Sequence, residues 1–371
     1  MRELVALAMP GGPDFVTAVQ RIWDDGDAVF PLDLRLPTPA RIRVLSAMAP
    51  HAIVDASGHR SSLDGGRAAH DGDALVMATS GSTGDPKGVV LTHEAVRASA
   101  IATTERIGQD AGDHWLACLP LAHIGGLAVV TRALTMGIPL TVLPRFDADA
   151  VASSAATLVS LVPATLPRVR TKQFRRIVLG GSRPPLDRPA NCIATYGMTE
   201  TGSGIVYDGY RLTGVDLRVI DGEIQVRGPM LLRSYRDGFD PKLDGGWLPT
   251  GDLGELADDG RLTVFGRAGD LIITGGENVF PEAIESVLAK HPGITEVAIT
   301  AVPDPMWGQA VVALVVAALP MHPPTLAELR DWVKADLAAF CAPQQLRLVD
   351  AIPRTALGKI RRGELVALAT P

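Results

Sequence analysis

Short apolar runs typical of buried strands alternate with longer Ala- and Leu-rich stretches, and this alternation restricts the fold more than any other feature of the chain. Ala74–Ala78 predicts a strand, and Thr92–Arg106 predicts a helix with Thr92 as its N-cap. Three further strands are expected, at Leu140–Leu143, Leu158–Val162 and Ile177–Leu179. Strands that alternate with helices favour an α/β fold with a largely buried sheet.

From Leu217 the pattern changes to short polar and apolar alternation. The dipeptides Asp221-Gly222, Asp237-Gly238 and Asp259-Gly260 mark turns between these short segments. This part of the chain therefore predicts an antiparallel sheet or a small barrel.

The remainder of the chain returns to longer elements. We expect a strand at Leu271–Thr274 and a helix opened by Pro281. Thr325 and Glu328 have the spacing of a capping box, which predicts a helix over Leu326–Phe340.

Composition and charge exclude several classes of protein. The chain has 371 residues, of which 47% are hydrophobic and 20% are charged, so it can bury a core, and its length suggests two or three compact units. Intrinsic disorder is excluded on the same grounds. The formal net charge of −6, with no Lys/Arg run against this acidic background, excludes a basic nucleic-acid-binding protein.

The sequence also lacks the signals of a membrane span, an export signal or a disulfide framework. The most apolar window, Ala310–Leu319, is half the length of a bilayer span and predicts a buried strand. The first residues, MRELVALA, are too short and too acidic for a signal peptide. Cys118, Cys192 and Cys341 stand far apart without a CxxC pair, which indicates neither disulfides nor a zinc site. We therefore expect a protein of the reducing cytoplasm.

A glycine-rich segment joins the first predicted strand to the apolar run Val89–Leu91. Its residues, Thr79–Gly88, read TSGSTGDPKG and carry very little side-chain bulk. Such a loop can wrap its amides and hydroxyls around an anion, and phosphate is the natural ligand. It is not a Walker A loop, because Pro86 precedes Lys87 and Gly88 follows it. A mobile hairpin turn is the alternative interpretation.

This string resembles the phosphate loop of the adenylate-forming superfamily, which includes acyl- and aryl-CoA synthetases, luciferases and peptide-synthetase adenylation domains. Four more motifs follow in the order of that family, and the five together cover most of the chain. They are YGMTE at Tyr196–Glu200, TGD at Thr250–Asp252, the hinge segment at Gly266–Asn278 and the lysine loop at Pro353–Lys359.

The resemblance implies a fold and a division of the chain. We expect an α/β protein in which residues 1–265 form a large adenylation domain of α/β sheet subdomains with a small antiparallel sheet or barrel. Residues 266–270 are the expected hinge, and residues 271–371 a small mobile α+β lid domain that carries Lys359. Because only 78 residues precede the glycine-rich loop, the adenylation domain is expected to be a shortened one.

The chemistry of this family explains the residue types. A carboxylate is a poor electrophile, and joining it to AMP gives a mixed anhydride that a thiol can attack. The enzyme must therefore hold ATP, Mg²⁺ and the carboxylate in line, and stabilise charge on the α-phosphate and on the departing pyrophosphate.

The resemblance assigns roles at the triphosphate and the metal. Glu200 is expected to ligate Mg²⁺, an ion that usually takes one or two carboxylates plus phosphate oxygens, and Thr199 to contact the α-phosphate. The loop residues expected at the β- and γ-phosphates are Thr79, Ser80, Gly81, Ser82, Thr83, Gly84 and Lys87.

A second group of residues is expected around the nucleoside. The residues implied at adenine are Gly180, Gly181, Ser182, Tyr196, Gly197 and Met198, with Tyr196 stacked on the base. Asp252 has the acceptor-only carboxylate that both ribose hydroxyls need, although Asp in such a turn often only caps local backbone. Arg267 is implied at ribose or phosphate.

The expected catalytic cation is Lys359, whose compact ammonium can bridge the substrate carboxylate and the α-phosphate. A solvated basic patch with Arg361 and Arg362 is the alternative.

Two further expectations concern the hinge and the second co-substrate. Many relatives have a polar residue two positions after Arg267 as a pivot. Here Gly269 stands there, so the pivot is expected at Gly269 or Asp270. Gly276 is implied on the route of the coenzyme A thiol.

His123, in LPLAHIGGL, stands where the family often places an aromatic residue or a histidine beside the acyl pocket, although a lone His among apolar residues is more often a core residue. This segment and the loop GGSRPP resemble the short actinobacterial o-succinylbenzoate–CoA ligases of menaquinone synthesis. The resemblance implies that ATP activates the succinyl carboxylate of 2-succinylbenzoate, an aromatic keto-diacid, and that CoA accepts the acyl group. Ser203 and Gly204 are candidates for contacts with the second carboxylate.

Other functions remain open at this point. Another acyl- or aryl-CoA synthetase, or a ligase that adenylates for a carrier protein, would share these motifs. A nucleotide-binding regulator without catalysis would be expected to lack Lys359 or Glu200, and both are present. Homodimers are common among relatives. A homodimer is expected for this chain by analogy alone.

Overall fold

The structure is a computed structural model that describes residues 2–80, 86–185, 187–355 and 358–370. The chain divides into two compact units. The first comprises Met1–Leu217, Gln225–Pro249 and Asp258–Leu262, and the second Arg218–Ile224, Thr250–Ala257 and Thr263–Pro371. The predicted hinge at 266–270 lies within the second unit and remains a prediction.

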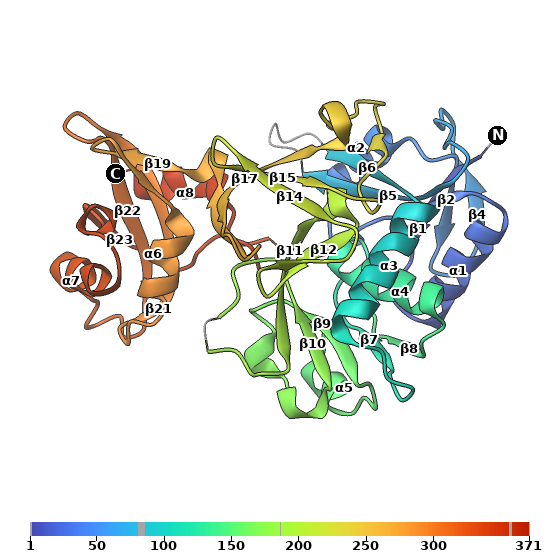
Figure 1. Ribbon diagram of the computed structural model, residues 1–371, viewed down its shortest axis with the longest axis horizontal. Helices are drawn as coiled ribbons and strands as arrows, with labels where there is room; N and C mark the ends of the chain where they lie inside the picture. Colours follow the sequence, from blue (N-terminus) through green and yellow to red (C-terminus); the bar gives the residue numbers. More distant parts are fainter. Residues whose placement is uncertain (1, 81–85, 186, 356–357, 371) are drawn as a thin grey trace. The chain divides into compact units, whose positions relative to one another are not determined.

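The first unit contains two seven-stranded sheets (Figure 1). One has the strand order β16-β6-β5-β2-β1-β3-β4, with β1 parallel to β2 and β3, and β5 antiparallel to β6. Its strands are β1 (Leu4–Ala8), β2 (Ala28–Pro31), β3 (Ala52–Asp55), β4 (Arg60–Ser62), β5 (Asp73–Ser80), β6 (Pro86–Thr92) and β16 (Ser234–Tyr235). Helix α1 (Pro13–Asp24) packs on β1 and β2, and α2 (Thr38–Met48) on β5 and β6.

The other sheet has the order β13-β12-β11-β10-β9-β7-β8, and its strands from β8 to β11 are parallel. They are β7 (Trp115–Ala117), β8 (Leu140–Val142), β9 (Leu158–Leu161), β10 (Arg176–Leu179), β11 (Cys192–Met198), β12 (Ser203–Tyr207) and β13 (Tyr210–Arg211). Val151 of α5 (Ala148–Ala152) and Phe174 help to bury one face of this sheet. The strands predicted before residue 180 are thus confirmed.

Two helices of the first unit pack against each other and connect its sheets (Figure 1). Helix α3 (His93–Ile107) contacts β5 and β6 of one sheet and β12 of the other, and α4 (Ile124–Met136) packs on β7, β8 and β9. Thr92 is the N-cap of α3, as predicted, because its Oγ1 accepts a hydrogen bond from the backbone N–H of Ala95 at 3.1 Å.

A four-stranded sheet contains the points at which the chain passes between the two units. Its order is β14 (Asp216–Ile220), β15 (Glu223–Arg227), β17 (Leu248–Leu256) and β18 (Leu262–Arg267). Asp221 and Gly222 both have positive φ, 51° and 81°, which confirms the tight turn that the dipeptide predicts.

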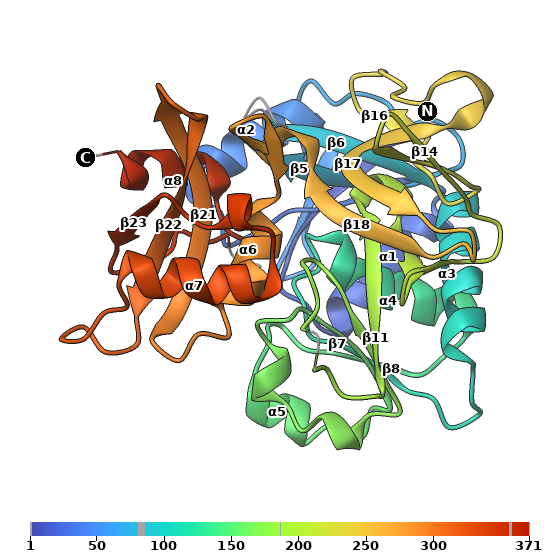
Figure 2. The same cartoon turned by 60° about the vertical axis from the view of Figure 1, so that its left-hand side comes forward.

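The second unit is built on one sheet that is covered on both faces (Figure 2). Its strands are β19 (Ile272–Thr274), β20 (Glu277–Val279), β21 (Ile294–Asp304), β22 (Gly308–Ala317) and β23 (Gln345–Leu348), and its helices α6 (Pro281–Leu288), α7 (Leu326–Asp336) and α8 (Arg362–Ala369). Val311 and Val315 of β22 pack in the core with α6 and α7, whereas Val312 and Leu314 pack in the core with α8. The predicted buried strand is confirmed, and its continuous apolar sequence follows from burial on both faces.

One predicted helix is shorter than expected. The capping box forms, since the Thr325 N–H donates to Glu328 Oε2 at 2.7 Å, but α7 ends at Asp336 rather than at Phe340. Leu337 leaves the helical conformation and packs, with Cys341, against the core of this unit. Burial of these side chains overrides the helical propensity of the Ala-rich sequence.

The remaining elements are short 3₁₀ turns. They lie at Leu166–Arg168, Thr171–Gln173, Thr199–Thr201, Asp244–Gly246, Ala268–Asp270 and Ala339–Cys341. The predicted α/β class, with a small α+β section at the end of the chain, is confirmed. Across the described ranges, no helix has both the length and the apolar character that crossing a bilayer requires.

Candidate active site

The predicted adenine residues meet where parallel strands of the first unit end. Gly180 follows β10, and Leu179 pairs with Ala194 of β11, so the loop from Gly180 lies beside Thr195 and Tyr196. A Cβ on Gly180 would lie 2.6 Å from Thr195 Oγ1, which explains the glycine, and Gly181 has a φ of 91°. Ligands of α/β proteins bind at this carboxyl edge of the sheet.

The YGMTE motif turns the chain back on itself at the end of β11. Gly197 pairs with Gly204 of β12, and a Cβ there would lie 2.3 Å from the carbonyl oxygen of Ser203, so no side chain fits. Thr201 Oγ1 accepts a hydrogen bond from the Met198 N–H at 2.9 Å and donates to the Ser203 carbonyl at 2.7 Å. This tight turn holds Thr199 and Glu200 at the strand end.

Glu200 is connected to the glycine-rich segment through Tyr235, a residue that the sequence analysis missed. Tyr235 donates from its hydroxyl to Glu200 Oε1 at 3.0 Å, and Lys87 Nζ lies 5.3 Å from the centroid of the Tyr235 ring. Strand β16 pairs with β6, which brings Tyr235 beside Val89. The only sequence signal was an aromatic residue just before the Asp237-Gly238 turn.

The chemistry of these side chains fits Mg²⁺ bound together with a nucleotide. Among the described residues there is no group of three or more His, Cys, Asp or Glu that could hold a metal ion. Magnesium usually takes one or two carboxylates, with phosphate oxygens and water completing the shell, and Glu200 supplies one.

The glycine-rich segment is the connection of a β-hairpin. Thr79 pairs with Lys87 across β5 and β6, and Thr79 Oγ1 donates to the Lys87 carbonyl at 3.4 Å. Ser80 ends β5, while Gly81, Ser82, Thr83 and Gly84 lie outside the described residues. Their contacts with phosphate remain a prediction.

In the second unit, Asp252 and Arg267 form an ion pair, and Lys359 lies within electrostatic reach of both. Arg267 Nε lies 2.9 Å from Asp252 Oδ1, and Arg267 Nη1 donates to the Thr250 carbonyl at 2.8 Å. Asp252 is nearly buried, with 10% of its side chain exposed. Desolvation lowers the pKa of the Lys359 ammonium and the Arg267 cation lowers it further, while Asp252 raises it. Asp252 therefore does more than cap its own turn.

The loop before Lys359 is closed by local hydrogen bonds. The Thr355 N–H donates to the Lys359 carbonyl at 2.7 Å, and Arg354 Nη1 donates to the Gly358 carbonyl at 2.8 Å. Ala356 and Leu357 of this loop lie outside the described residues.

Arg362 is not part of a solvated basic patch, because carboxylates surround it. Its guanidinium pairs with Asp270 at 3.1 Å, Glu285 at 3.0 Å and Glu282 at 3.5 Å. Burial alone would lower the pKa of Arg362, but these acidic neighbours raise it. The predicted hinge residue Asp270 is thereby connected to the segment that follows Lys359.

Gly275 and Gly276 form the two-residue turn between β19 and β20, with φ values of 60° and 86°. Positive φ at both positions explains the glycine pair. Contact of Gly276 with coenzyme A remains a prediction.

His123 is the N-cap residue of α4 and is half-buried rather than enclosed in the core. Its Nε2 lies 2.8 Å from Arg35 Nη2 and 3.4 Å from Asp33 Oδ2, with 35% of the side chain exposed. Burial would raise the pKa of the Asp33 carboxyl, but the guanidinium and the backbone N–H of Arg35 outweigh burial and hold the pKa far below the usual range. Asp33 and Arg35 carried no motif and were missed.

A buried arginine of α4 is the third finding that sequence analysis missed. Arg132 is 2% exposed, its Nη2 donates to Ser203 Oγ at 3.3 Å, and its guanidinium carbon lies 5.1 Å from the ring centroid of Trp115. Among the described residues, its Nε and Nη1 have no hydrogen-bond partner and no carboxylate forms a salt bridge with it. Burial lowers the pKa of this guanidinium.

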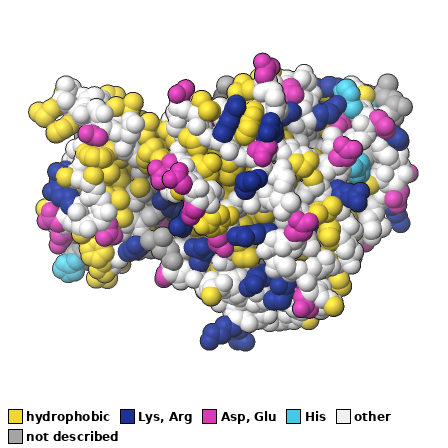
Figure 3. Space-filling model, in the orientation of Figure 1, with side chains coloured by type: hydrophobic (Ala, Val, Ile, Leu, Met, Phe, Trp, Pro, Cys, Tyr) yellow, Lys and Arg dark blue, Asp and Glu magenta, His cyan; other side chains and the backbone are white. Residues whose placement is uncertain are grey.

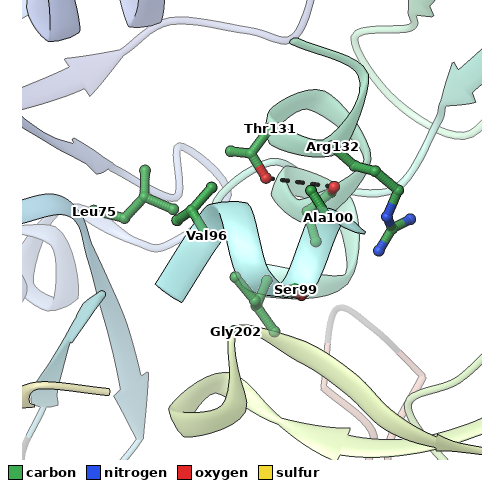
Figure 4. Close-up of a pocket in the computed structure, with 9 residues that line it drawn as sticks. Leu75, Val96, Ser99, Ala100, Thr131, Arg132 and Gly202 are labelled. Carbon is green, nitrogen blue, oxygen red and sulfur yellow. Dashed lines mark hydrogen bonds between the residues drawn. The ribbon is translucent and has the colours of Figure 1, made fainter. Parts of the chain in front are cut away.

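The cavity beside Arg132 lies between α3 and α4 (Figure 4). Val96, Ser99 and Ala100 of α3 and Thr131 of α4 line it, and Gly202 adjoins them. Its volume of about 10 Å³ is close to the space of one water molecule, so a larger group could enter only if the lining side chains move.

Comparison with known proteins identifies the family. Residues 62–236 match the AMP-binding enzyme family, and residues 283–359 match the AMP-binding enzyme C-terminal domain. The chain is 38% identical over 360 residues to a probable 2-succinylbenzoate–CoA ligase of Mycobacterium tuberculosis (strain CDC 1551 / Oshkosh), covering 88% of this chain and 94% of that protein. The chain belongs to the AMP-binding enzyme family.

Solved structures agree with this assignment of the AMP-binding enzyme. The o-succinylbenzoate CoA synthetase of Bacillus subtilis in complex with the acyl-adenylate intermediate matches with a TM-score of 0.86 and 28% identity, over 98% of this chain and 88% of that one. The same enzyme in complex with ATP and magnesium ion matches with a TM-score of 0.85 and 29% identity, over 98% and 89%.

Charged side chains of both signs are visible on one face of the protein (Figure 3). On the face shown in Figure 3, Lys and Arg side chains are scattered among acidic and uncharged ones rather than gathered in one stripe.

We predict that Arg132→Met stabilises the protein. A buried charge without a counter-ion is costly, and replacing it with an apolar side chain of similar length should raise the free energy of unfolding by about 1–4 kcal/mol. Urea denaturation measures this, with the exposed Arg97 of α3 changed to Met as the matched control. Destabilisation by Arg132→Met alone would mean that the guanidinium supports the fold.

Proposed function

We propose that this AMP-binding enzyme activates the succinyl carboxylate of 2-succinylbenzoate with ATP and transfers the acyl group to coenzyme A. The products are 2-succinylbenzoyl-CoA, AMP and pyrophosphate, and the pathway is menaquinone biosynthesis. Family membership supports the adenylate chemistry. The ligase and synthetase relatives named above support 2-succinylbenzoate as the acid.

The observation that carries the choice of a diacid is the unpaired guanidinium of Arg132. A monocarboxylic acid presents its one carboxylate to ATP and leaves such a buried cation without a counter-ion. The ring carboxylate of 2-succinylbenzoate would supply that counter-ion in a charge-assisted hydrogen bond. Ser203, already hydrogen-bonded to Arg132, is the second donor in reach of this carboxylate.

The reaction divides between the residues of the two units. Glu200 holds Mg²⁺, which when bound neutralises charge on the phosphates, and Tyr235 orients the Glu200 carboxylate. The segment proposed to bind the β- and γ-phosphates includes Lys87 and the hydroxyl residues Thr79 and Ser80.

The second unit supplies the ribose and catalytic residues. Asp252 accepts from the ribose hydroxyls beside Arg267, and Lys359 stabilises charge on the α-phosphate and the substrate carboxylate during adenylation. The chain is proposed to divide into a domain of residues 1–265, a hinge at 266–270 and a lid at 271–371. This division would let Lys359 serve adenylation and move out of the active site during thioester formation.

The proposal includes a cytoplasmic location, coenzyme A as acceptor and a small-molecule acid as the substrate, and a homodimer by analogy with relatives. Another acyl- or aryl-CoA synthetase is the second candidate, because the adenylate-forming residues do not depend on the acid. If a carrier protein were the acceptor, the adenylation step would be the same. Only the thiol that accepts the acyl group would differ, because it would belong to the carrier protein and not to coenzyme A.

Substrate turnover tests the function. AMP and thioester formation from 2-succinylbenzoate should exceed that from a panel of fatty and benzoic acids, because the diacid satisfies Arg132 and the others do not. Turnover of the panel without turnover of 2-succinylbenzoate would overturn the assignment and favour a general acyl-CoA synthetase.

A pair of substrates isolates the role of Arg132. For Arg132→Met we expect kcat/KM for 2-succinylbenzoate to fall by about 100-fold, the size of one lost charge-assisted hydrogen bond. The same variant should leave kcat/KM unchanged for 4-oxo-4-phenylbutanoate, which lacks the ring carboxylate. Arg97→Met is the matched control, and an equal loss with both substrates would contradict recognition of the second carboxylate.

Lys359→Ala tests the division between half-reactions. Adenylation should be abolished, while thioester formation from preformed acyl-adenylate continues, and Lys290→Ala should leave both unchanged. Because the pKa of Lys359 is lowered from 10.5, wild-type adenylation should decline on the alkaline side at a lower pH than an ordinary lysine would give. Equal loss of both half-reactions would refute this role.

A further inference from the structure

Two residues outside the family motifs contact the ring of His123. Asp33 and Arg35 follow β2 and form a bidentate pair, with Arg35 Nε 2.8 Å from Asp33 Oδ1 and Nη2 2.7 Å from Oδ2. The backbone N–H of Arg35 also donates to Asp33 Oδ1 at 3.0 Å. The same Nη2 lies 2.8 Å from His123 Nε2, so its two hydrogens face a carboxylate and an imidazole.

This geometry determines the protonation of His123. A guanidinium has donors and no acceptor, so at 2.8 Å the imidazole Nε2 must be the acceptor, because two N–H groups facing each other would repel. The contact of Nε2 with Asp33 Oδ2 is longer, at 3.4 Å. An Nε2 that accepts this hydrogen bond leaves the ring proton on Nδ1.

The remaining donor of His123 is available to a ligand. Within the described residues Nδ1 has no hydrogen-bond partner, and the side chain is partly exposed. The backbone of His123 is fixed as well, since its carbonyl accepts from Gly126 and Leu127, both at 3.0 Å. A Cβ on Gly126 would lie 2.4 Å from the Pro120 carbonyl, so only glycine allows α4 to begin so close to this loop.

We propose that Asp33 and Arg35 are positioning residues for the acyl half-site. They hold His123 as the Nδ1–H tautomer, which presents a hydrogen-bond donor to the carboxylate being activated. Asp33 orients the guanidinium, which in turn donates to His123 Nε2. The inference rests on the proposed function for the role of His123, but not on which acid is bound.

Nitrogen NMR of protein labelled with ¹⁵N-histidine tests the tautomer directly. His123→Gln assigns the resonances. In the wild type at neutral pH, Nδ1 of His123 should carry the proton and Nε2 should have the shift of an unprotonated nitrogen. Arg35→Gln should move the population toward the Nε2–H tautomer, and Arg35→Lys should restore Nδ1–H only in part, because lysine lacks the planar fork.

Arg41→Gln is the matched control, since Arg41 lies in helix α2 and, among the described residues, its side chain hydrogen-bonds to Thr38 of the same helix. It should leave the His123 signals unchanged. An Nε2–H tautomer or an imidazolium in the wild type would overturn the proposal, as would the same spectrum in wild type and Arg35→Gln.

Steady-state kinetics test the consequence for the reaction. Arg35→Gln and Asp33→Asn should raise KM for the acid by about tenfold, the size of one positioned hydrogen bond, with KM for ATP unchanged. An equal rise in both KM values would indicate a general structural role and contradict the proposal. If 2-succinylbenzoate proves not to be the substrate while the tautomer result holds, the proposed function fails and this inference stands. If 2-succinylbenzoate is the substrate but His123 does not have the Nδ1–H tautomer, this inference is wrong and the proposed function stands.

Discussion

The close approach of β11 and β12 at Gly197 is the constraint on which the nucleotide side of the site depends. The carbonyl of Ser203 and the Cα of Gly204 occupy the space that any side chain at Gly197 would need. The chain can therefore reverse direction within a few residues, and Thr201 closes the turn with hydrogen bonds to Met198 and Ser203. One tight reversal thus places Tyr196, Glu200 and Ser203 at the same end of the sheet, where adenine, magnesium and acid are proposed to meet.

Each cation of the proposed site is stabilised by its own neighbours and not by the net charge of the chain. The chain is formally negative, yet its proposed ligands are phosphates and carboxylates, so each cation must be supported where it acts. The supports differ. Tyr235 offers its ring to Lys87, Asp252 pairs with Arg267, and Asp33 with Arg35. Arg132 has the hydroxyl of Ser203 and the indole ring of Trp115 as neighbours, and no carboxylate among the described residues pairs with it.

Local signals in the sequence were sufficient for most of the fold. Caps such as Thr92, turns such as Asp221-Gly222 and the apolar run of β22 depend on neighbouring residues, and each was predicted correctly. The end of α7 was wrong because tertiary burial of Leu337 competes with local propensity. Tyr235 and Arg132 were not predictable, because their partners are far away in the sequence and follow no motif spacing. Asp33 and Arg35 are neighbours of each other, but no motif indicates their contact with the distant His123. The assigned roles of the motif residues came from the family resemblance, and the structure adds their surroundings.

The carboxylates around Arg362 have a consequence for anion binding by this unit. Asp270, Glu282 and Glu285 all contact the guanidinium of Arg362, which lies three residues after Lys359. An arginine enclosed by three carboxylates has its charge neutralised by its neighbours, so Arg362 is not a position at which this unit would bind phosphate.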